Sequence, residues 1–201
     1  MKNTYRTINV SSKFLLKEKQ SKFIGYAFPI YEVELVRKHI NNLKKTHHTA
    51  GHFCYAYQIE ISNKTCRLND DGEPRNSAGT PIYGQIMSFD LTNILIIVVR
   101  YFGGTKLGIG GLISAYKECA KLTIKANNII TKEIIIPIQI KFKFALINFV
   151  MRTVKKYDLE ISRREMEEYY VFKVFTTKNN NLIVCNHFRQ NPEIEFLQIE
   201  I

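Results

Sequence analysis

Five of the chain's ten glycines lie between residues 103 and 111, directly after the apolar run from Ile94 to Val99. From Arg100 to Gly111 the sequence reads RYFGGTKLGIGG. Because glycine loses more conformational entropy on folding than any other residue, such a cluster indicates backbone that passes close to a ligand or to another part of the protein. The pattern predicts a buried strand over residues 93–101, a glycine-rich loop, and a helix over residues 112–127.

The length and charge of the chain limit the classes of protein it can belong to. Its 201 residues suit one large domain or two small ones. The net charge of +11 is uneven, because residues 1–133 carry 19 basic and 10 acidic side chains, whereas residues 134–201 carry 10 and 8. A basic front half suits a polyanion such as RNA. The alternative is that the abundance of lysine, isoleucine and asparagine reflects AT-rich coding alone.

Neither a membrane segment nor a disulfide framework is expected. The apolar runs are short, and the first residues lack the apolar core of a signal peptide. A cytoplasmic protein without membrane contact is therefore expected, and in that compartment scattered cysteines are free thiols. The four cysteines are Cys54, Cys66, Cys119 and Cys185.

The back half predicts a complete small domain. Leu146, Val150 and Val154 lie on one stripe of a helix over residues 145–157. A second helix, capped by Asn179 or Asn180, ends near residue 191. With strands over residues 134–144, 159–163, 169–177 and 193–201, the order is βαββαβ, which defines a ferredoxin-like domain. The predicted domains are residues 1–132 and 133–201.

The front half predicts an α/β domain. Strands are expected over residues 5–10, 13–17, 22–29 and 52–62, and a helix over residues 32–45. In the strand from residue 52, Phe53, Tyr55 and Tyr57 alternate with Cys54 and Ala56, so the two sets face opposite sides. Thr80 and Pro81 suit the N-cap and first position of a short helix that runs to Met87.

The glycine-rich loop is a candidate anion site, because backbone N–H groups and a helix dipole meet where a strand leads into a helix. The Walker P-loop is absent, since Ile109 and Gly110 replace its lysine and hydroxyl residue. The alternative is that the glycines only permit a tight turn and close helix packing. The candidate phosphate- or nucleic-acid-binding residues are Arg100, Tyr101, Gly103, Gly104, Lys106, Gly108, Gly110 and Gly111.

A second candidate site is the acidic turn from Asp70 to Arg75. Asp70, Asp71 and Glu73 could share Mg²⁺ or divide the roles of acid and base if they converge. Ordinary turn chemistry is the favoured interpretation, with Arg75 neutralising a carboxylate locally. The residues of this candidate pocket are His52, Asp70, Asp71, Glu73 and Arg75.

Histidines near this turn suggest a metal site only weakly. His47, His48 and His52 lie close to Cys54 in the sequence, but on one strand face only His52 and Cys54 remain together. Zinc commonly takes three or four protein ligands. We therefore expect no metal and no cofactor, and we assign no catalytic residue.

These motifs together resemble the YigZ/IMPACT family. The resemblance implies a front domain of two α/β layers like the second domain of ribosomal protein S5, and a back domain like the last domain of elongation factor G. Eukaryotic members are regulators that compete for the activator of a starvation-responsive translation kinase, and no catalytic residues come with the family. The segment Arg75-Asn76-Ser77 departs from the family pattern. The matching motifs are SKFI from Ser21, HxCxAY from His52, DDGEP from Asp70, AGxP from Ala78 and RYFGGxKLGxGGL from Arg100.

The sequence thus predicts a non-enzymatic cytoplasmic regulator or binding protein that contacts RNA or a ribosome-associated component through the glycine-rich loop. One alternative is an enzyme that acts on a nucleotide or phosphorylated substrate with Mg²⁺ at the acidic turn. It requires the acidic turn and the glycine-rich loop to form one pocket. The other alternative is a protein-interaction module.

Overall fold

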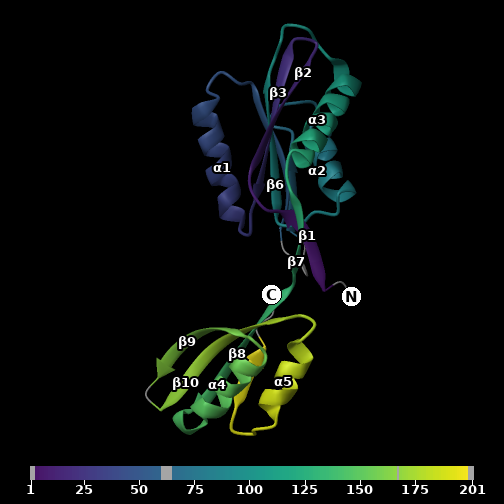
Figure 1. Cartoon of the computed structure of the whole chain (residues 1–201). Coiled ribbons are helices and arrows are strands. Elements are labelled where there is room, and N and C mark those ends of the chain that lie inside the picture. Colours follow the sequence, from purple (N-terminus) through teal and green to yellow (C-terminus); the bar gives the residue numbers. More distant parts are fainter. Residues whose placement is uncertain (1–2, 60–64, 167, 199–201) are drawn as a thin grey trace. The chain divides into compact units, whose positions relative to one another are not determined.

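The computed structural model describes residues 3–59, 65–166 and 168–198 (Figure 1). The chain divides into two compact units. The first is Tyr5–Lys132, and the second is Glu133–Ile201 together with Met1–Thr4. The ends of the predicted strands at residues 60–62 and 199–201 lie outside the described residues.

A five-stranded antiparallel sheet forms the centre of the first unit. Its central strand, β6, carries the apolar run that precedes the glycines, and pairs with β3 on one side and β4 on the other. In spatial order the strands are β2 (Ser12–Glu18), β3 (Ser21–Pro29), β6 (Ile94–Tyr101), β4 (His52–Ile59) and β5 (Thr65–Asn69).

Helices cover both faces of this sheet (Figure 1). Helix α1 (Val33–Thr46) packs on one face, and α2 (Gly79–Ser88) and α3 (Gly108–Lys125) pack on the other. The expectation of two layers was therefore wrong for this unit, which has three. The reason is that successive side chains of β6 point to opposite faces and all are apolar from Ile94 to Val99, so each face needs a cover.

The glycines after β6 are divided between a loop and a helix. Helix α3 begins at Gly108, four residues before its predicted start, so Gly108, Gly110 and Gly111 form its first turn. Glycine has a low intrinsic helix propensity, and here the packing of the rest of α3 overrides that preference.

Two strands of the structure were not predicted from the sequence. They are β5, and β7 (Ile129–Glu133), which pairs with β1 (Thr4–Ile8).

The second unit has the predicted βαββαβ order. Its antiparallel sheet has the strand order β11-β8-β10-β9, which is the ferredoxin-like arrangement. Apolar side chains on one sheet face pack against both helices, with Phe142 and Phe172 opposite Val150 and Phe188. The elements are β8 (Ile135–Lys143), the short 3-10 helix η1 (Phe144–Leu146), α4 (Ile147–Lys156), β9 (Glu160–Met166), β10 (Tyr169–Thr177), α5 (Asn181–Arg189) and β11 (Glu195–Gln198).

Candidate functional site

Asp70 acts as the N-terminal cap of α2. One carboxylate oxygen, Oδ1, accepts hydrogen bonds from the backbone N–H groups of Ala78 and Gly79 at 2.9 and 2.8 Å. The other, Oδ2, accepts one from Asn76 N–H at 2.8 Å. The predicted cap, Thr80, instead lies inside the helix, and its hydroxyl donates to Asn76 Oδ1 at 3.2 Å. A carboxylate at the first helical N–H groups stabilises the helix through hydrogen bonds and the dipole.

Asp71 holds the acidic turn against β4. Its Oδ2 accepts a hydrogen bond from Phe53 N–H at 2.6 Å, and its backbone carbonyl accepts one from His52 Nδ1 at 2.8 Å. The Asp71 N–H in turn donates to Asn69 Oδ1 at 2.6 Å. Its φ of 41° lies in the left-handed region, which aspartate tolerates better than most residues. The second carboxylate is therefore engaged with backbone groups of the same sheet.

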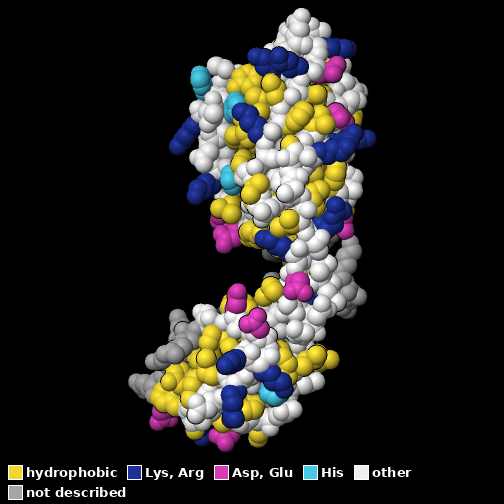
Figure 2. Space-filling view, in the orientation of Figure 1, with side chains coloured by type: hydrophobic (Ala, Val, Ile, Leu, Met, Phe, Trp, Pro, Cys, Tyr) yellow, Lys and Arg dark blue, Asp and Glu magenta, His cyan; other side chains and the backbone are white. Residues whose placement is uncertain are grey.

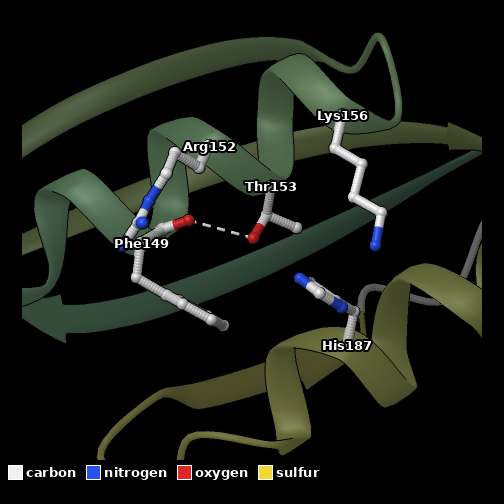
Figure 3. A pocket seen from close by; sticks show the side chains of 5 residues that line it. All are labelled: Phe149, Arg152, Thr153, Lys156 and His187. Carbon is white, nitrogen blue, oxygen red and sulfur yellow. Dashed lines mark hydrogen bonds between the residues drawn. The ribbon is translucent and has the colours of Figure 1, made fainter.

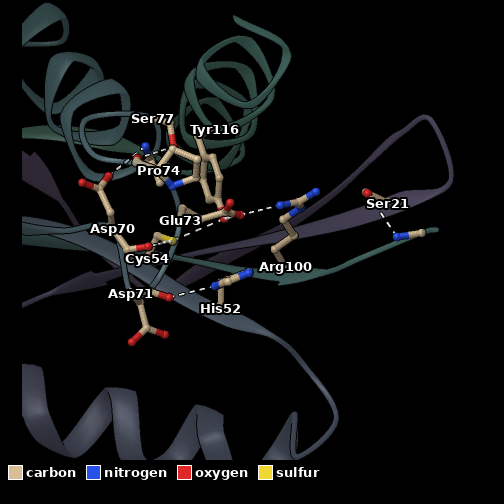
Figure 4. Close-up of polar contacts among 12 residues, drawn as sticks. Ser21, His52, Cys54, Asp70, Asp71, Glu73, Pro74, Ser77, Arg100 and Tyr116 are labelled. Atoms are coloured by element: carbon tan, nitrogen blue, oxygen red, sulfur yellow. Dashed lines mark hydrogen bonds and ion pairs between the residues drawn. The ribbon is translucent and has the colours of Figure 1, made fainter. Parts of the chain in front are cut away.

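Glu73 is buried and lies between two donors (Figure 4). Its Oε1 accepts hydrogen bonds from Arg100 Nη1 at 2.6 Å and from Tyr116 Oη at 2.8 Å. The side chains of Arg100 and Glu73 are only 7% and 4% exposed. Arg75, which the sequence suggested as the local counter-ion, is exposed, and the cation that pairs with Glu73 is Arg100.

Arg100 is enclosed by aromatic rings as well as by this ion pair. Its guanidinium lies 5.4 Å from the ring centre of Phe23 and 5.6 Å from that of Phe102. Among the described residues, no group accepts a hydrogen bond from its buried Nε. Since Arg100 extends from the end of β6 and Glu73 from the acidic turn, the pair joins the turn to the strand that leads into the glycines.

The three carboxylates therefore have separate partners. Among the described residues, no three histidine, cysteine or acidic side chains lie close enough together to hold a metal ion.

The Cys54 thiol is buried, donates to the Asp70 carbonyl at 2.9 Å and lies 3.3 Å from Tyr116 Oη. Burial raises the pKa of this thiol well above its usual range, so Cys54 stays protonated and is a poor nucleophile.

His47, at the end of α1, links this helix to the sheet face that it covers, which is the face opposite α2 and α3. Its Nε2 lies 2.7 Å from Tyr26 Oη, and its Nδ1 lies 2.7 Å from Tyr101 Oη. Tyr101 therefore points to the α1 side, whereas Arg100 beside it points to the α3 side, as alternation along a strand requires. Loss of solvent contact, with a smaller contribution from Lys13, lowers the pKa of His47.

Gly103 is the point of closest approach in the glycine segment, residues 102–111. A Cβ there would overlap backbone atoms of Gln20 and Ser21 in the β2–β3 hairpin, and Ser21 Oγ accepts a hydrogen bond from Gly103 N–H at 3.2 Å. Gly104 and Gly108 have φ angles of +87° and +72°, which other residues rarely adopt. These three glycines thus meet structural requirements of the turn.

The end of the segment is accessible. Lys106, Gly108, Ile109 and Gly110 are exposed. The N-cap of α3, Leu107, provides no side-chain hydrogen bond, and the first turn contains no acidic residue. The backbone N–H groups of the first turn of α3 therefore have no side-chain acceptor from the N-cap, and an exposed lysine, Lys106, lies next to them in the sequence.

Apolar side chains surround this helix start. Phe102 is 56% exposed, Ile109 is 60% exposed and Ile113 is 39% exposed. The sequence pattern suggested no role for these residues or for Tyr116. Tyr116 could have been recognised because its hydroxyl falls on the inward stripe of α3, between Ala115 and Cys119, where a polar group needs a partner.

The comparisons with known proteins identify the family. The sequence model of the Impact N-terminal domain matches residues 19–124, which is more than half of the chain. The chain belongs to the IMPACT family.

Two relatives show how far the similarity extends. The IMPACT family member YvyE of Bacillus subtilis is 35% identical over 116 residues, which cover 58% of this chain and 54% of YvyE. The chain thus spans about half of the length of that relative. An IMPACT family member of Haemophilus influenzae is 31% identical over 148 residues, which cover 71% of this chain and 70% of the relative.

A solved structure described as that of a hypothetical protein has a similar fold, with a TM-score of 0.80. The alignment covers 100% of this chain and 99% of that one, at 20% sequence identity. At this identity the likeness concerns the fold.

In the described part of the chain, no helix has both the length and the apolar character needed to cross a bilayer.

Proposed function

We propose that this chain is a non-enzymatic cytoplasmic regulator that binds RNA of the translation machinery through the glycine segment. Membership in the IMPACT family supports a regulatory role, because the family resemblance implies that eukaryotic members are regulators of translation. The analogies to ribosomal protein S5 and to elongation factor G form part of this proposal, because both have nucleic-acid-associated folds. Since a fold alone assigns no function, the argument for RNA binding has to come from the site.

One observation carries the proposal: the start of α3 presents exposed, uncapped backbone N–H groups next to an exposed lysine. A phosphate group accepts hydrogen bonds from such groups and is attracted by the helix dipole. Lys106 supplies the full positive charge. Arg100, in contrast, contributes by shaping the turn, because Glu73 already neutralises its guanidinium.

The geometry gives the magnesium enzyme less support. That alternative needs carboxylates that converge and are free to bind a cation. Asp70 instead caps α2, Asp71 binds the backbone of β4, and Glu73 binds Arg100 and Tyr116. Each carboxylate thus has a structural role of its own.

Salt dependence of RNA binding tests the phosphate contact. We expect Lys106→Gln to weaken binding of a fluorescein-labelled single-stranded RNA and to lower the slope of log affinity against log salt by about 0.7, the value for one phosphate. Lys125→Gln is the matched control, because Lys125 is exposed in the last turn of the same helix. An affinity that does not change with salt, or equal effects of the two substitutions, would refute the proposal.

A protein partner is the second candidate. Phe102, Ile109 and Ile113 expose apolar area around the same helix start, and exposed apolar patches mark interaction sites. This candidate predicts that Ile109→Ser abolishes capture of one specific protein in nuclease-treated extract while Lys106→Gln does not. Capture that disappears after nuclease treatment would count against it.

A further inference from the structure

Helices α4 and α5 of the second unit form an outward face that is basic in every charged position. Neither helix contains an aspartate or glutamate. Figure 2 shows Lys and Arg side chains gathered around a histidine over these two helices. The permanently charged side chains of the two helices are Arg152, Lys155 and Lys156 on α4 and Arg189 on α5. Burial, with a smaller contribution from Lys156, lowers the pKa of His187 on α5, so this ring is neutral at neutral pH.

A groove of about 260 Å³ lies between the two helices, lined by Phe149, Arg152, Thr153, Lys156 and His187 (Figure 3). Its floor is apolar and aromatic. The Phe149 and His187 rings stack at 5.6 Å with 7° between their planes, and the buried Thr153 hydroxyl donates to the Phe149 carbonyl at 3.0 Å. Neither contact uses the side chain of Arg152 or Lys156.

The rim consists of Arg152 and Lys156, which are four residues apart and so lie on the same side of α4. Both are exposed. Arg152 Nε donates to the Asn148 carbonyl at 3.2 Å, which orients the guanidinium. Among the described residues, no carboxylate pairs with either cation. Two uncompensated charges beside an apolar groove suit a ligand with anionic groups and flat apolar groups.

The opposite sheet face provides a contrast within the same unit. Lys141 and Lys143 on β8 are also exposed, but each lies 3.9 Å from a carboxylate, Glu195 and Glu193 respectively. A polyanion would have to displace these carboxylates there, whereas α4 and α5 themselves carry no carboxylate. Charge complementarity therefore favours the face formed by α4 and α5.

We infer that the groove between α4 and α5 is a binding site for single-stranded RNA, with Arg152 and Lys156 on consecutive phosphates and a base or ribose on the aromatic floor. Free bases of a single strand can reach such a floor, whereas those of a duplex are already stacked. The site is separate from the glycine segment, and it does not rest on the function proposed for that segment.

A charge-matched pair of double variants of the full chain tests the inference. We expect Arg152→Gln/Lys156→Gln to weaken binding of fluorescein-labelled oligouridine and to lower the salt slope by about 1.4, the value for two single-strand phosphates. Lys141→Gln/Lys143→Gln removes the same charge from the sheet face and leaves the slope nearly unchanged. Circular dichroism checks that both variants keep the wild-type fold.

Three results would overturn the inference. They are equal losses in both double variants, no binding by the wild type at low salt, or equally tight binding of labelled polyglutamate, which would show attraction to charge alone. The variant Lys106→Gln, measured alongside, reports on the glycine segment. An effect of Lys106→Gln without one of Arg152→Gln/Lys156→Gln would support the proposed function and refute this site, and the reverse pattern would do the opposite.

Discussion

Arg100 and Glu73 form a buried ion pair, 2.6 Å from Nη1 to Oε1, that links the end of β6 to the acidic turn. A buried charge without its partner is strongly unfavourable, because desolvation is no longer offset. The pair therefore holds the acidic turn against the strand that leads into the glycine segment, and the relative position of turn and strand depends on both residues.

Glu73→Gln is expected to destabilise the first unit by about 3–5 kcal/mol, because Arg100 is left buried without a counter-charge. Urea unfolding followed by circular dichroism measures the loss. Glu118→Gln is the control, since Glu118 pairs with Lys121 at 3.2 Å on the surface and its loss changes stability by about 0.5 kcal/mol or less. Adding Arg100→Met to Glu73→Gln should recover part of the stability, and a further loss in the double variant would contradict this account.

Asp70→Ala is expected to cost about 2 kcal/mol, because three backbone N–H groups lose their acceptor: those of Ala78 and Gly79 at the start of α2, and that of Asn76 in the turn before it. Thr80→Ala should change stability by less than about 0.5 kcal/mol, since Thr80 is not the cap. The same unfolding measurement compares the two. The opposite order of effects would return the cap to Thr80.

Gly103→Ala is expected to destabilise the protein by about 1–3 kcal/mol, because the new Cβ meets backbone of Gln20 and Ser21 that cannot move aside cheaply. Gly110→Ala is the matched control in the same segment, because nothing lies within 4 Å of its added Cβ. Alanine there should stabilise α3 by about 0.5–1 kcal/mol. Thermal unfolding that ranks the two variants equally would exclude a steric role for Gly103.

The His47 contacts predict that stability falls in mild acid. Burial lowers the pKa of His47 in the folded protein below its unfolded value of about 6.5. As pH falls through that value, the unfolded chain binds a proton that the folded chain resists, so unfolding becomes more favourable. Unfolding midpoints between about pH 8 and about pH 5.5 should show this decline.

The substitution His47→Gln isolates this contribution. It should lower stability at pH 8, because the contacts with Tyr26 and Tyr101 change, and should flatten the decline towards acid pH. Part of the slope remains, since burial also lowers the pKa values of His39 and His187. A slope identical to that of the wild type would assign the acid sensitivity to other groups.

Periodicity predicted most long elements of this chain. The apolar stripe of α1, the strand β10 and the βαββαβ order of the second unit follow from side-chain spacing, which packing then confirms. The start of α3 was missed because glycine opposes helix formation locally, and only tertiary packing overrides it. The edge strand β5 was missed because it has only five residues, most of them exposed, and so gives a weak signal.

The partners within the site could not be predicted in the same way. Sequence proximity suggested Arg75 as the counter-ion of Glu73, but the sheet brings Arg100 to it across 27 positions. Likewise, Asp70 reaches the start of α2 from nine positions before Gly79. The first contact depends on how the sheet arranges its strands, and the second on the path of the connection between β5 and α2. A local pattern specifies neither.

The pairing of β1 with β7 has a consequence for synthesis of the chain. β1 ends at Ile8, and its partner begins only at Ile129. At a translation rate of about 5–20 residues per second, β1 exists for about 6–24 s before the ribosome has made the strand that binds it. During that time the N–H and C=O groups of β1 that β7 later engages are open to water and to other chains, which makes β1 a segment that a nascent-chain chaperone could protect.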